Sequence, residues 1–282
     1  MTLIVESVGP QATVQDLGRP GYADVGVPTG GAADRGALTL ANRLVGNPDG
    51  ACGLELLMGN AVLLAEEPVV VAVTGAPASV SSDDRAMPFG EAFLLQEGDR
   101  LRIGTPVAGL RTYVGVRGGI DEPRTLGSRS TSPTANIGPE PLQSGRRLPV
   151  ADAPDSVVPE PFPGQYAWTN PVTVRVLLGP RDDWFTDDAV RILLQQRWTT
   201  SSDLDRVGVR LEGPPLERSR CGELASEGMV RGAIQVPPNG QPVVFLADHP
   251  TTGGYPVIAV VTAADTDRLA QLRPGDTVRF TL

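Results

Sequence analysis

The chain has 282 residues, 24 basic and 33 acidic, and its net charge of −9 argues against nucleic acid and anionic membrane surfaces as partners. Hydrophobic residues make up 40% and charged residues 20%, a balance typical of a folded protein and not of a disordered one. All 24 basic residues are arginine, which excludes a Walker A phosphate loop, a Schiff-base enzyme and a biotin attached to this chain, since each requires lysine.

The first part of the chain predicts short β-strands separated by glycine- and proline-rich turns. Its start has no basic segment and no long apolar core, so we expect a cytoplasmic protein without a membrane span. Asp34 is a candidate N-cap for a helix over 35–46. Leu38, Ala41 and Val45 would share one face of that helix. The strands predicted here are 3–7, 69–75, 92–96 and 111–116.

The stretch between Pro139 and Pro171 is proline-rich and weakly patterned, which is typical of an inter-domain linker. We therefore expect two domains, 1–160 and 161–282. EGDRLRIG near the end of the first resembles PGDTVRFT at the end of the second, which favours two similar halves. In the second half, Thr186 is a candidate N-cap for a helix that runs up to Trp198. Strands are predicted at 172–178, 243–247, 257–262 and 277–282, with a short third helix near 265–272.

Two glycine-rich regions of the first half are candidate sites. Segment 13–34 precedes the helix capped by Asp34, so its backbone amides favour an anion; a tight loop that needs glycine dihedrals is the alternative. Around 111–131, Arg117 and Arg129 lie beside glycines and hydroxyl residues. Such arginines suit a carboxylate or phosphate, and two ordinary surface arginines are the alternative.

The third candidate region, 226–256, predicts a hairpin over PPNG followed by the polar loop DHPTTGGYP. His249 is the single histidine, so a multi-histidine metal site is excluded. A serine-hydrolase triad is disfavoured because the chain has no G-x-S-x-G elbow. Cys52 and Cys221 are too few for a disulfide framework or a thiolate zinc site.

Taken in order, the motifs TVQDLGRPGY, GVPTGGAAD with ANRLVGN, LGSRST, SEGMVRGAIQVPPNGQP and DHPTTGGYP resemble those of one family. It comprises KipA-like proteins, allophanate hydrolase subunit 2-like proteins, the biotin-dependent carboxyltransferase subdomain of urea carboxylase, and the C-type subunit of 5-oxoprolinase. The resemblance runs from about Thr13 to Phe280. It implies a mostly β fold of two cyclophilin-like β-barrel domains, with a few short helices and a cleft between the domains.

The resemblance also implies site residues, motif by motif. The catalytic candidates are Asp34, Arg117, Arg129 and Asp248. The substrate-binding candidates are Tyr113, Ser130, Thr251, Thr252 and Tyr255. Two departures stand out: relatives often carry GGxxGR where this chain reads STSPTANIGPEPLQSGRRL, so the pocket near 132–146 is undefined, and Ala33 stands where relatives favour methionine.

Urea carboxylase fuses its carboxyltransferase to a biotin carboxylase and a biotin carrier, and this chain contains neither. Within the family, the chain therefore resembles the 5-oxoprolinase type. This implies ATP and Mg²⁺ as cofactors, a small amide or lactam substrate, and B-type (KipI-like) and A-type (LamB/YcsF-like) subunits as partners. The complex would hydrolyse 5-oxoproline to glutamate, and the chain alone would be inactive. The alternatives are a KipA-like regulatory binding subunit and a carboxyltransferase or allophanate hydrolase-related subunit that acts with a separate biotinylated protein.

Overall fold

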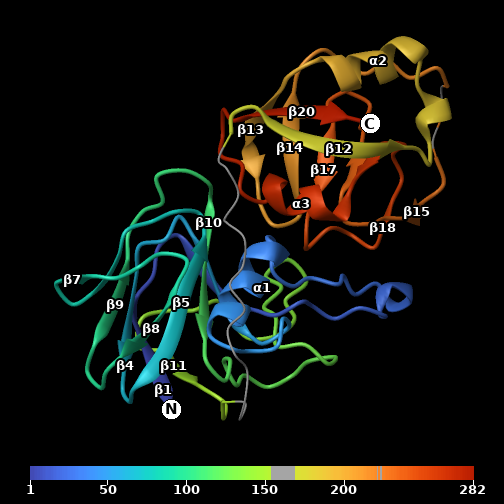
Figure 1. Cartoon of the computed structure of the whole chain (residues 1–282). Helices are drawn as coiled ribbons and strands as arrows, with labels where there is room; N and C mark the ends of the chain where they lie inside the picture. Colours follow the sequence, from blue (N-terminus) through green and yellow to red (C-terminus); the bar gives the residue numbers. More distant parts are fainter. Residues whose placement is uncertain (154–168, 221, 223) are drawn as a thin grey trace. The chain divides into compact units, whose positions relative to one another are not determined.

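The computed structural model describes residues 1–153, 169–220, 222 and 224–282 (Figure 1). The chain divides into two compact units, one formed by Met1–Arg19 with Gly30–Ala167 and the other by Pro20–Thr29 with Trp168–Leu282. Each unit has its own sheets and its own buried core. The boundary predicted near residue 160 lies outside the described residues, as does much of the predicted linker.

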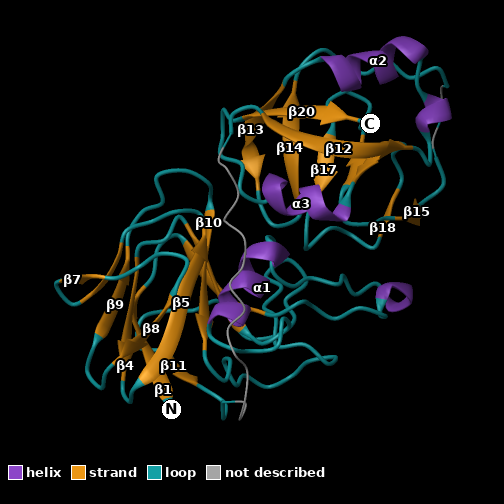
Figure 2. Ribbon diagram, in the orientation of Figure 1, coloured by secondary structure: helices purple, strands orange, loops and turns teal. Residues whose placement is uncertain are grey.

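The first unit is built from two antiparallel sheets (Figure 2). Its strands are β1 (Thr2–Ser7), β2 (Gln11–Gln15), β3 (Gly53–Leu57), β4 (Ala61–Ala65), β5 (Val69–Gly75), β6 (Val80–Ser82), β7 (Arg85–Ala86), β8 (Ala92–Leu95), β9 (Arg100–Ile103), β10 (Arg111–Val116) and β11 (Arg147–Pro149). One sheet has the order β11-β1-β4-β9-β6-β7 and the other the order β2-β3-β10-β5-β8. A buried apolar cluster draws Leu3 and Leu63 from the first sheet and Leu54, Val73 and Val114 from the second.

Helix α1 (Arg35–Leu44) covers the outer face of the five-stranded sheet, where it packs on β10, β5 and β3. Asp34 caps it as predicted, since the side chain accepts a hydrogen bond from the N–H of Ala37. Ala37 and Leu38 pack against Tyr113 of β10. Every residue of β10 is buried because apolar groups lie on both of its faces. A polar side chain on this strand therefore needs an internal partner.

The second unit contains a closed seven-stranded barrel in the order β12-β19-β16-β17-β14-β13-β20. Its strands are β12 (Val172–Leu178), β13 (Trp198–Leu204), β14 (Gly208–Glu212), β16 (Ala233–Gln235), β17 (Val243–Phe245), β19 (Val257–Val261) and β20 (Thr277–Thr281). A separate ribbon pairs β15 (Glu227–Gly228) with β18 (Thr252–Gly253). Closure leaves the barrel without a free edge.

Two α-helices lie against this barrel, α2 (Asp187–Gln195) and α3 (Ala263–Leu269). Thr186 caps α2 as predicted. The 3-10 turns of the described chain include η1 (Ala23–Val25) and η2 (Asp182–Trp184). The predicted mostly β class is confirmed, and β5, β10 and β12 match their predicted bounds.

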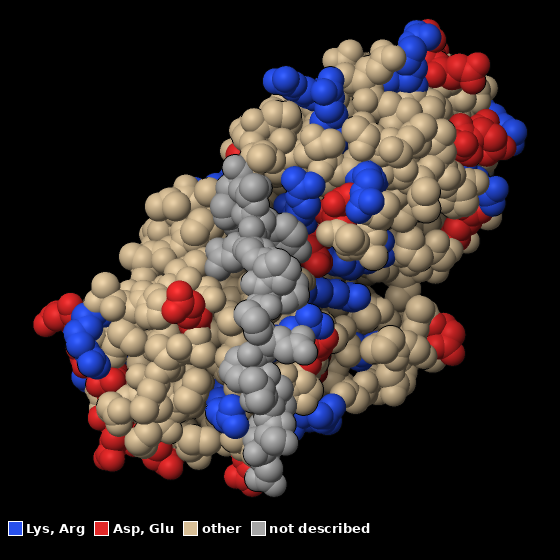
Figure 3. Space-filling view, viewed as in Figure 1, with Lys and Arg blue, Asp and Glu red and all other residues tan. Residues whose placement is uncertain are grey.

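On the face drawn in Figure 3, arginine and acidic side chains are interspersed. Ion pairs at the surface of the first unit include Arg43 with Asp49 and Arg100 with Glu6. Among the described residues, no helix is both long enough and apolar enough to cross a bilayer.

Candidate functional site

A dense polar cluster of the first unit surrounds the carboxylate of Asp16, which follows β2 and is 7% exposed. Its Oδ1 accepts hydrogen bonds from the hydroxyl groups of Ser128 at 2.6 Å and Ser130 at 2.5 Å. The backbone N–H groups of Gly18 and Arg129 each donate to the carboxylate at 2.7 Å. We call these five residues the Asp16 cluster. One charged group thus ties a serine-rich loop to the end of β2.

The guanidinium of Arg129 lies at the edge of the Asp16 cluster. Its Nε donates to the carbonyl oxygen of Glu122 at 2.7 Å, and its Nη2 pairs with Asp121 Oδ1 at 2.5 Å. The side chain keeps 21% of its surface exposed. The structure therefore brings two predicted site residues, Arg129 and Ser130, together and leaves part of the cation accessible.

Three polar atoms beside the Asp16 cluster are buried without a hydrogen-bond partner among the described residues: Gln15 Oε1, Thr131 Oγ1 and Ser132 Oγ. Gln15 Nε2 donates to the carbonyl oxygen of Thr131 at 2.8 Å, which links β2 to this loop. Buried polar groups normally have a partner. A polar ligand group or a water would therefore be stabilised beside these three atoms.

Arg117, the other predicted arginine, lies at the C-terminal end of α1. Its Nη1 donates to the carbonyl oxygen of Val45 at 3.2 Å. A cation in this position complements the helix dipole, which gives Arg117 a structural role.

The segment near 132–146, whose sequence departs from the family pattern, borders a hollow of about 460 Å³. That hollow is lined by Glu140, Pro141, Gln143, Ser144 and Arg146.

A second polar network of the first unit lies where α1 begins. Glu55 of β3 and Tyr113 of β10 are cross-strand partners, and the tyrosine hydroxyl donates to Glu55 Oε2 at 2.8 Å. The hydroxyl oxygen accepts from the N–H of Asp34 at 2.8 Å. Arg111 Nε lies 3.5 Å from Glu55 Oε1, and both of these side chains are 4% exposed. Asp34 and Tyr113, both predicted site residues, therefore belong to one buried network.

Burial, and after it the charge of Glu55, raises the pKa of Tyr113 well above its ordinary value. The hydroxyl is therefore protonated at neutral pH and donates to Glu55. With its side chain 0% exposed, Tyr113 positions the start of α1 and offers its hydroxyl to protein groups. This placement favours a positioning role over the predicted direct contact with substrate.

The same network accounts for the backbone amides that the sequence suggested for an anion. The N–H of Ala33 donates to Glu55, that of Asp34 to Tyr113 and that of Ala37 to Asp34. Gly31 has φ +86°, and a Cβ there would lie 2.7 Å from backbone atoms of the opposing turn. The geometry favours the tight-loop interpretation of segment 13–34.

Replacing Tyr113 by phenylalanine is expected to lower the free energy of unfolding by about 1–3 kcal/mol, because Glu55 and the Asp34 N–H both lose a buried partner. Urea unfolding followed by circular dichroism measures this change. Tyr255→Phe is the control, since Tyr255 is 44% exposed. Equal effects of the two substitutions would contradict the positioning role.

The polar centre of the second unit is the ion pair between Arg206 and Asp248. Nε and Nη2 of Arg206 contact the two carboxylate oxygens at 2.9 and 3.1 Å. The side chains are 5% and 0% exposed. Both oxygens of the predicted catalytic aspartate are therefore engaged by one guanidinium. The next residue, His249, is also buried; its Nδ1 donates to the carbonyl oxygen of Pro250 at 2.7 Å.

The remaining predicted residues follow along the chain. Thr252 lies in β18 and is exposed, and Thr251 before it is half-buried. Tyr255 is 44% exposed, with the guanidinium of Arg218 at 5.9 Å from its ring centre. Gln235 Nε2 donates to the carbonyl oxygen of Tyr255 at 3.0 Å. These side chains present hydroxyl and aromatic groups at one end of the β15–β18 ribbon.

Sequence reasoning missed several residues that organise these networks. Asp16 carried a usable signal, since an aspartate after an alternating strand and two residues before Gly18 is typical of an Asx turn. Glu55 stands in the apolar strand GLELL, and a carboxylate at such a position requires a buried partner. Arg206 carried no comparable signal, because its partner lies 42 residues away.

A family profile described as carboxyltransferase domain, subdomain A and B, matches residues 25–282. The chain is 38% identical to the C-type subunit of 5-oxoprolinase from Escherichia coli (strain K12), over 96% of this chain and 88% of that protein. It is 33% identical to the C-type subunit of 5-oxoprolinase from Haemophilus influenzae, over 97% of this chain and 88% of that protein.

The crystal structure of the Kluyveromyces lactis urea amidolyase superposes on the chain with a TM-score of 0.93 at 31% identity. The match covers 99% of this chain and 18% of the urea amidolyase chain, so this chain spans a small part of that protein's length. The family resemblance seen in the motifs is confirmed. Since the profile covers most of the sequence, the chain belongs to the family of carboxyltransferase domains with subdomains A and B.

Proposed function

We propose that the chain is the C-type subunit of an ATP-dependent 5-oxoprolinase. The observation that carries this proposal is the match to two proteins named as this subunit, along 96% and 97% of this chain and 88% of each relative. With B-type (KipI-like) and A-type (LamB/YcsF-like) partners, the complex activates 5-oxoproline with ATP and hydrolyses it to glutamate. The chain alone is inactive.

The chemistry explains why arginines would matter in such a complex. A lactam carbonyl is unreactive, and phosphorylation of its oxygen creates a leaving group for hydrolysis. The negative charge on the transferring group requires cations. Because this chain has no lysine, its contribution must come from arginine. Arg129 is our candidate, since the Asp16 cluster holds its backbone while its guanidinium remains partly exposed.

Mg²⁺ is commonly held by one or two carboxylates together with substrate phosphates, so one subunit can supply only part of its ligands. Among the described residues, no group of three or more histidine, cysteine, aspartate or glutamate residues is placed to hold a metal ion. Asp16 and Asp248, the central carboxylates of the two units, are engaged by protein donors. We propose that the ligands of Mg²⁺ and most of the ATP contacts come from a partner protein of the complex.

A second candidate function is that of a biotin-dependent carboxyltransferase acting with a separate biotinylated protein. The match to the urea amidolyase structure supports it. A third candidate is a KipA-like regulatory subunit, which would bind its partner without catalysis. Glutamate formation by the chain mixed with its B-type and A-type partners, 5-oxoproline and ATP distinguishes the three. Carboxyl transfer from a biotinylated carrier, or a stable complex without turnover, would replace the oxoprolinase proposal.

Arg129→Ala is expected to reduce turnover of the complex at least about tenfold, because a guanidinium bound to an anionic group contributes about 1.5–3 kcal/mol. Arg129→Lys should fail as well, since an ammonium lacks the fork that reaches Glu122 and Asp121 together. Arg124→Ala, in the same loop and exposed, is the matched control. Turnover of Arg129→Ala equal to that of the control would remove Arg129 from the site.

A further inference from the structure

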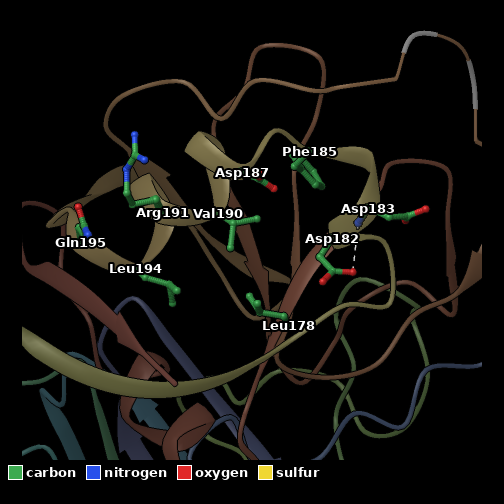
Figure 4. A pocket seen from close by; sticks show the side chains of 9 residues that line it. All are labelled: Leu178, Asp182, Asp183, Phe185, Asp187, Val190, Arg191, Leu194 and Gln195. Carbon is green, nitrogen blue, oxygen red and sulfur yellow. Dashed lines mark hydrogen bonds between the residues drawn. The ribbon is translucent and has the colours of Figure 1, made fainter.

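The second unit carries a groove of about 660 Å³ that none of the candidate site residues lines. It is bordered by the end of β12, by η2 and by α2, and Figure 4 shows it from close by. The lining residues are Leu178, Asp182, Asp183, Phe185, Asp187, Val190, Arg191, Leu194 and Gln195.

The floor of the groove is apolar. Val190 and Leu194 are one turn apart on α2 and half-buried, so they share a face of the helix. Leu178 at the end of β12 is 39% exposed, and Figure 4 shows it beneath these two side chains in the same hollow. The two buried residues of α2, Ala189 and Leu193, lie where the helix packs on β20. Helix α2 thus has one apolar stripe for its own barrel and another left open to the groove.

The rim of the groove is acidic. Asp182 and Asp183 of η2 and Asp187 of α2 line it together with a single cation, Arg191. That cation is paired with Asp188 at 2.7 Å. Asp183 is paired with Arg220 at 2.7 Å, whereas neither Asp182 nor Asp187 forms an ion pair within the described part of the chain. An apolar floor beside unpaired carboxylates is the surface that a cationic, amphipathic segment complements.

We propose that this groove docks an amphipathic helix of a partner protein, with leucine-like side chains on one face and lysine or arginine beside them. Helix α2 has nine residues and is about 14 Å long at 1.5 Å per residue, which matches two to three turns of such a partner. The apolar face would cover Leu178, Val190 and Leu194, and the cations would lie against Asp182 and Asp187 of the rim. This surface does not depend on which reaction the complex catalyses.

The test uses the full chain and a fluorescein-labelled peptide of leucine and lysine, about 15 residues long, with leucine at helical spacing. Fluorescence anisotropy measures its affinity. Leu178→Ser is expected to weaken binding about tenfold, because it removes an apolar side chain from the interface. Leu177→Ser is the matched control: Leu177 is 69% exposed, adjacent in sequence and outside the groove lining, and its substitution should change affinity by less than about twofold.

The charge requirement is tested in parallel. The double variant Asp182→Asn/Asp187→Asn should weaken binding of the leucine–lysine peptide about tenfold, and the effect should shrink at high salt. Asp83→Asn/Asp84→Asn makes the same change in net charge at two exposed residues of the first unit and should have little effect. A peptide with glutamate in place of lysine should bind at least about tenfold more weakly.

Three results would overturn the proposal. One is absence of binding by the unaltered chain; another is an equal loss in the groove and control variants, which would mean non-specific attraction to an acidic protein. The third is a concentration-dependent dimer in sedimentation that Leu178→Ser abolishes, since the groove would then be filled by a second copy of this chain. Circular dichroism of each variant establishes that its fold is retained. Activity of the enzyme complex is not read in these assays, so failure here is distinct from failure of the oxoprolinase proposal.

Discussion

Asp248→Asn is expected to lower the free energy of unfolding by about 3–5 kcal/mol, because it leaves the guanidinium of Arg206 buried without its counter-charge. The two side chains are 5% and 0% exposed, so solvent cannot replace the lost carboxylate. The backbone N–H of residue 248 donates to the carbonyl oxygen of Arg206 at 2.9 Å, so the loop that carries Thr251 and Thr252 should loosen together with the ion pair. Chemical unfolding of the isolated chain measures the change.

Two further variants show whether the ion pair is the cause. Asp203→Asn breaks the exposed pair with Arg210 and should cost less than about 1 kcal/mol. The double variant Arg206→Met/Asp248→Leu should be more stable than Asp248→Asn, since neither position of the pair then carries a buried charge. The family resemblance makes Asp248 a catalytic candidate, whereas its buried ion pair with Arg206 favours a structural role. Unchanged melting of Asp248→Asn with lost turnover in the complex would identify the catalytic role.

Asp16→Asn is expected to lower the free energy of unfolding by about 2–4 kcal/mol, because hydrogen bonds to a charged acceptor are stronger than those to a neutral one. The carboxylate accepts from four donors, in Gly18, Ser128, Arg129 and Ser130. An amide has one oxygen and turns its NH₂ toward at least one of these donors. The loop that carries Arg129 should then lose its fixed position.

Chemical unfolding measures the stability of Asp16→Asn, and an activity assay measures turnover of the complex that contains it. Both the free energy of unfolding and the turnover are expected to fall. Asp121→Asn, which removes only the partly exposed ion-pair partner of Arg129, should cost less than about 1 kcal/mol. Equal stability of Asp16→Asn and the unaltered chain would show that the cluster does not hold the loop.

Local signals predicted a large part of the fold. Asp34 and Thr186 were identified as helix caps because a capping side chain bonds to an amide only three residues away. The β-branched run 111–116 gave the bounds of β10 for a similarly local reason. The third helix begins at Ala263, two residues before its predicted start, and the structure shows no side-chain cap at Thr262. The predicted start therefore missed the first two residues of α3.

Long-range pairing could not be predicted from the sequence pattern. The barrel closes through β20, which pairs in parallel with β12 about a hundred residues earlier in the chain, from Val172 opposite Val278 onward. The Asp16–Ser130 contact spans 114 residues. Each residue of such a contact fits the sequence pattern of its own strand or loop, so no local rule links the two positions. The family resemblance identified the candidate site residues, and the structure shows which protein groups bind them.

The partners change how several predicted residues are interpreted. Asp34, Tyr113 and Asp248 are buried and bonded to other protein groups, which favours structural roles. Arg129 is held in place by the Asp16 cluster and remains partly exposed, which favours contact with a ligand. Tyr255 is also exposed, and its role stays a prediction.

The central claim is that this chain acts only as one subunit of a 5-oxoprolinase. The most direct measurement is ATP hydrolysis that depends on 5-oxoproline, recorded for the purified chain alone and after addition of its B-type and A-type partners. The amides at the start of α1 and the carboxylates of Asp16 and Asp248 are already engaged within the protein, so the chain offers only part of a phosphoryl-transfer site. We predict no 5-oxoproline-dependent hydrolysis by the chain alone and its appearance, with glutamate, when both partners are added. Robust hydrolysis by the isolated chain would contradict the account.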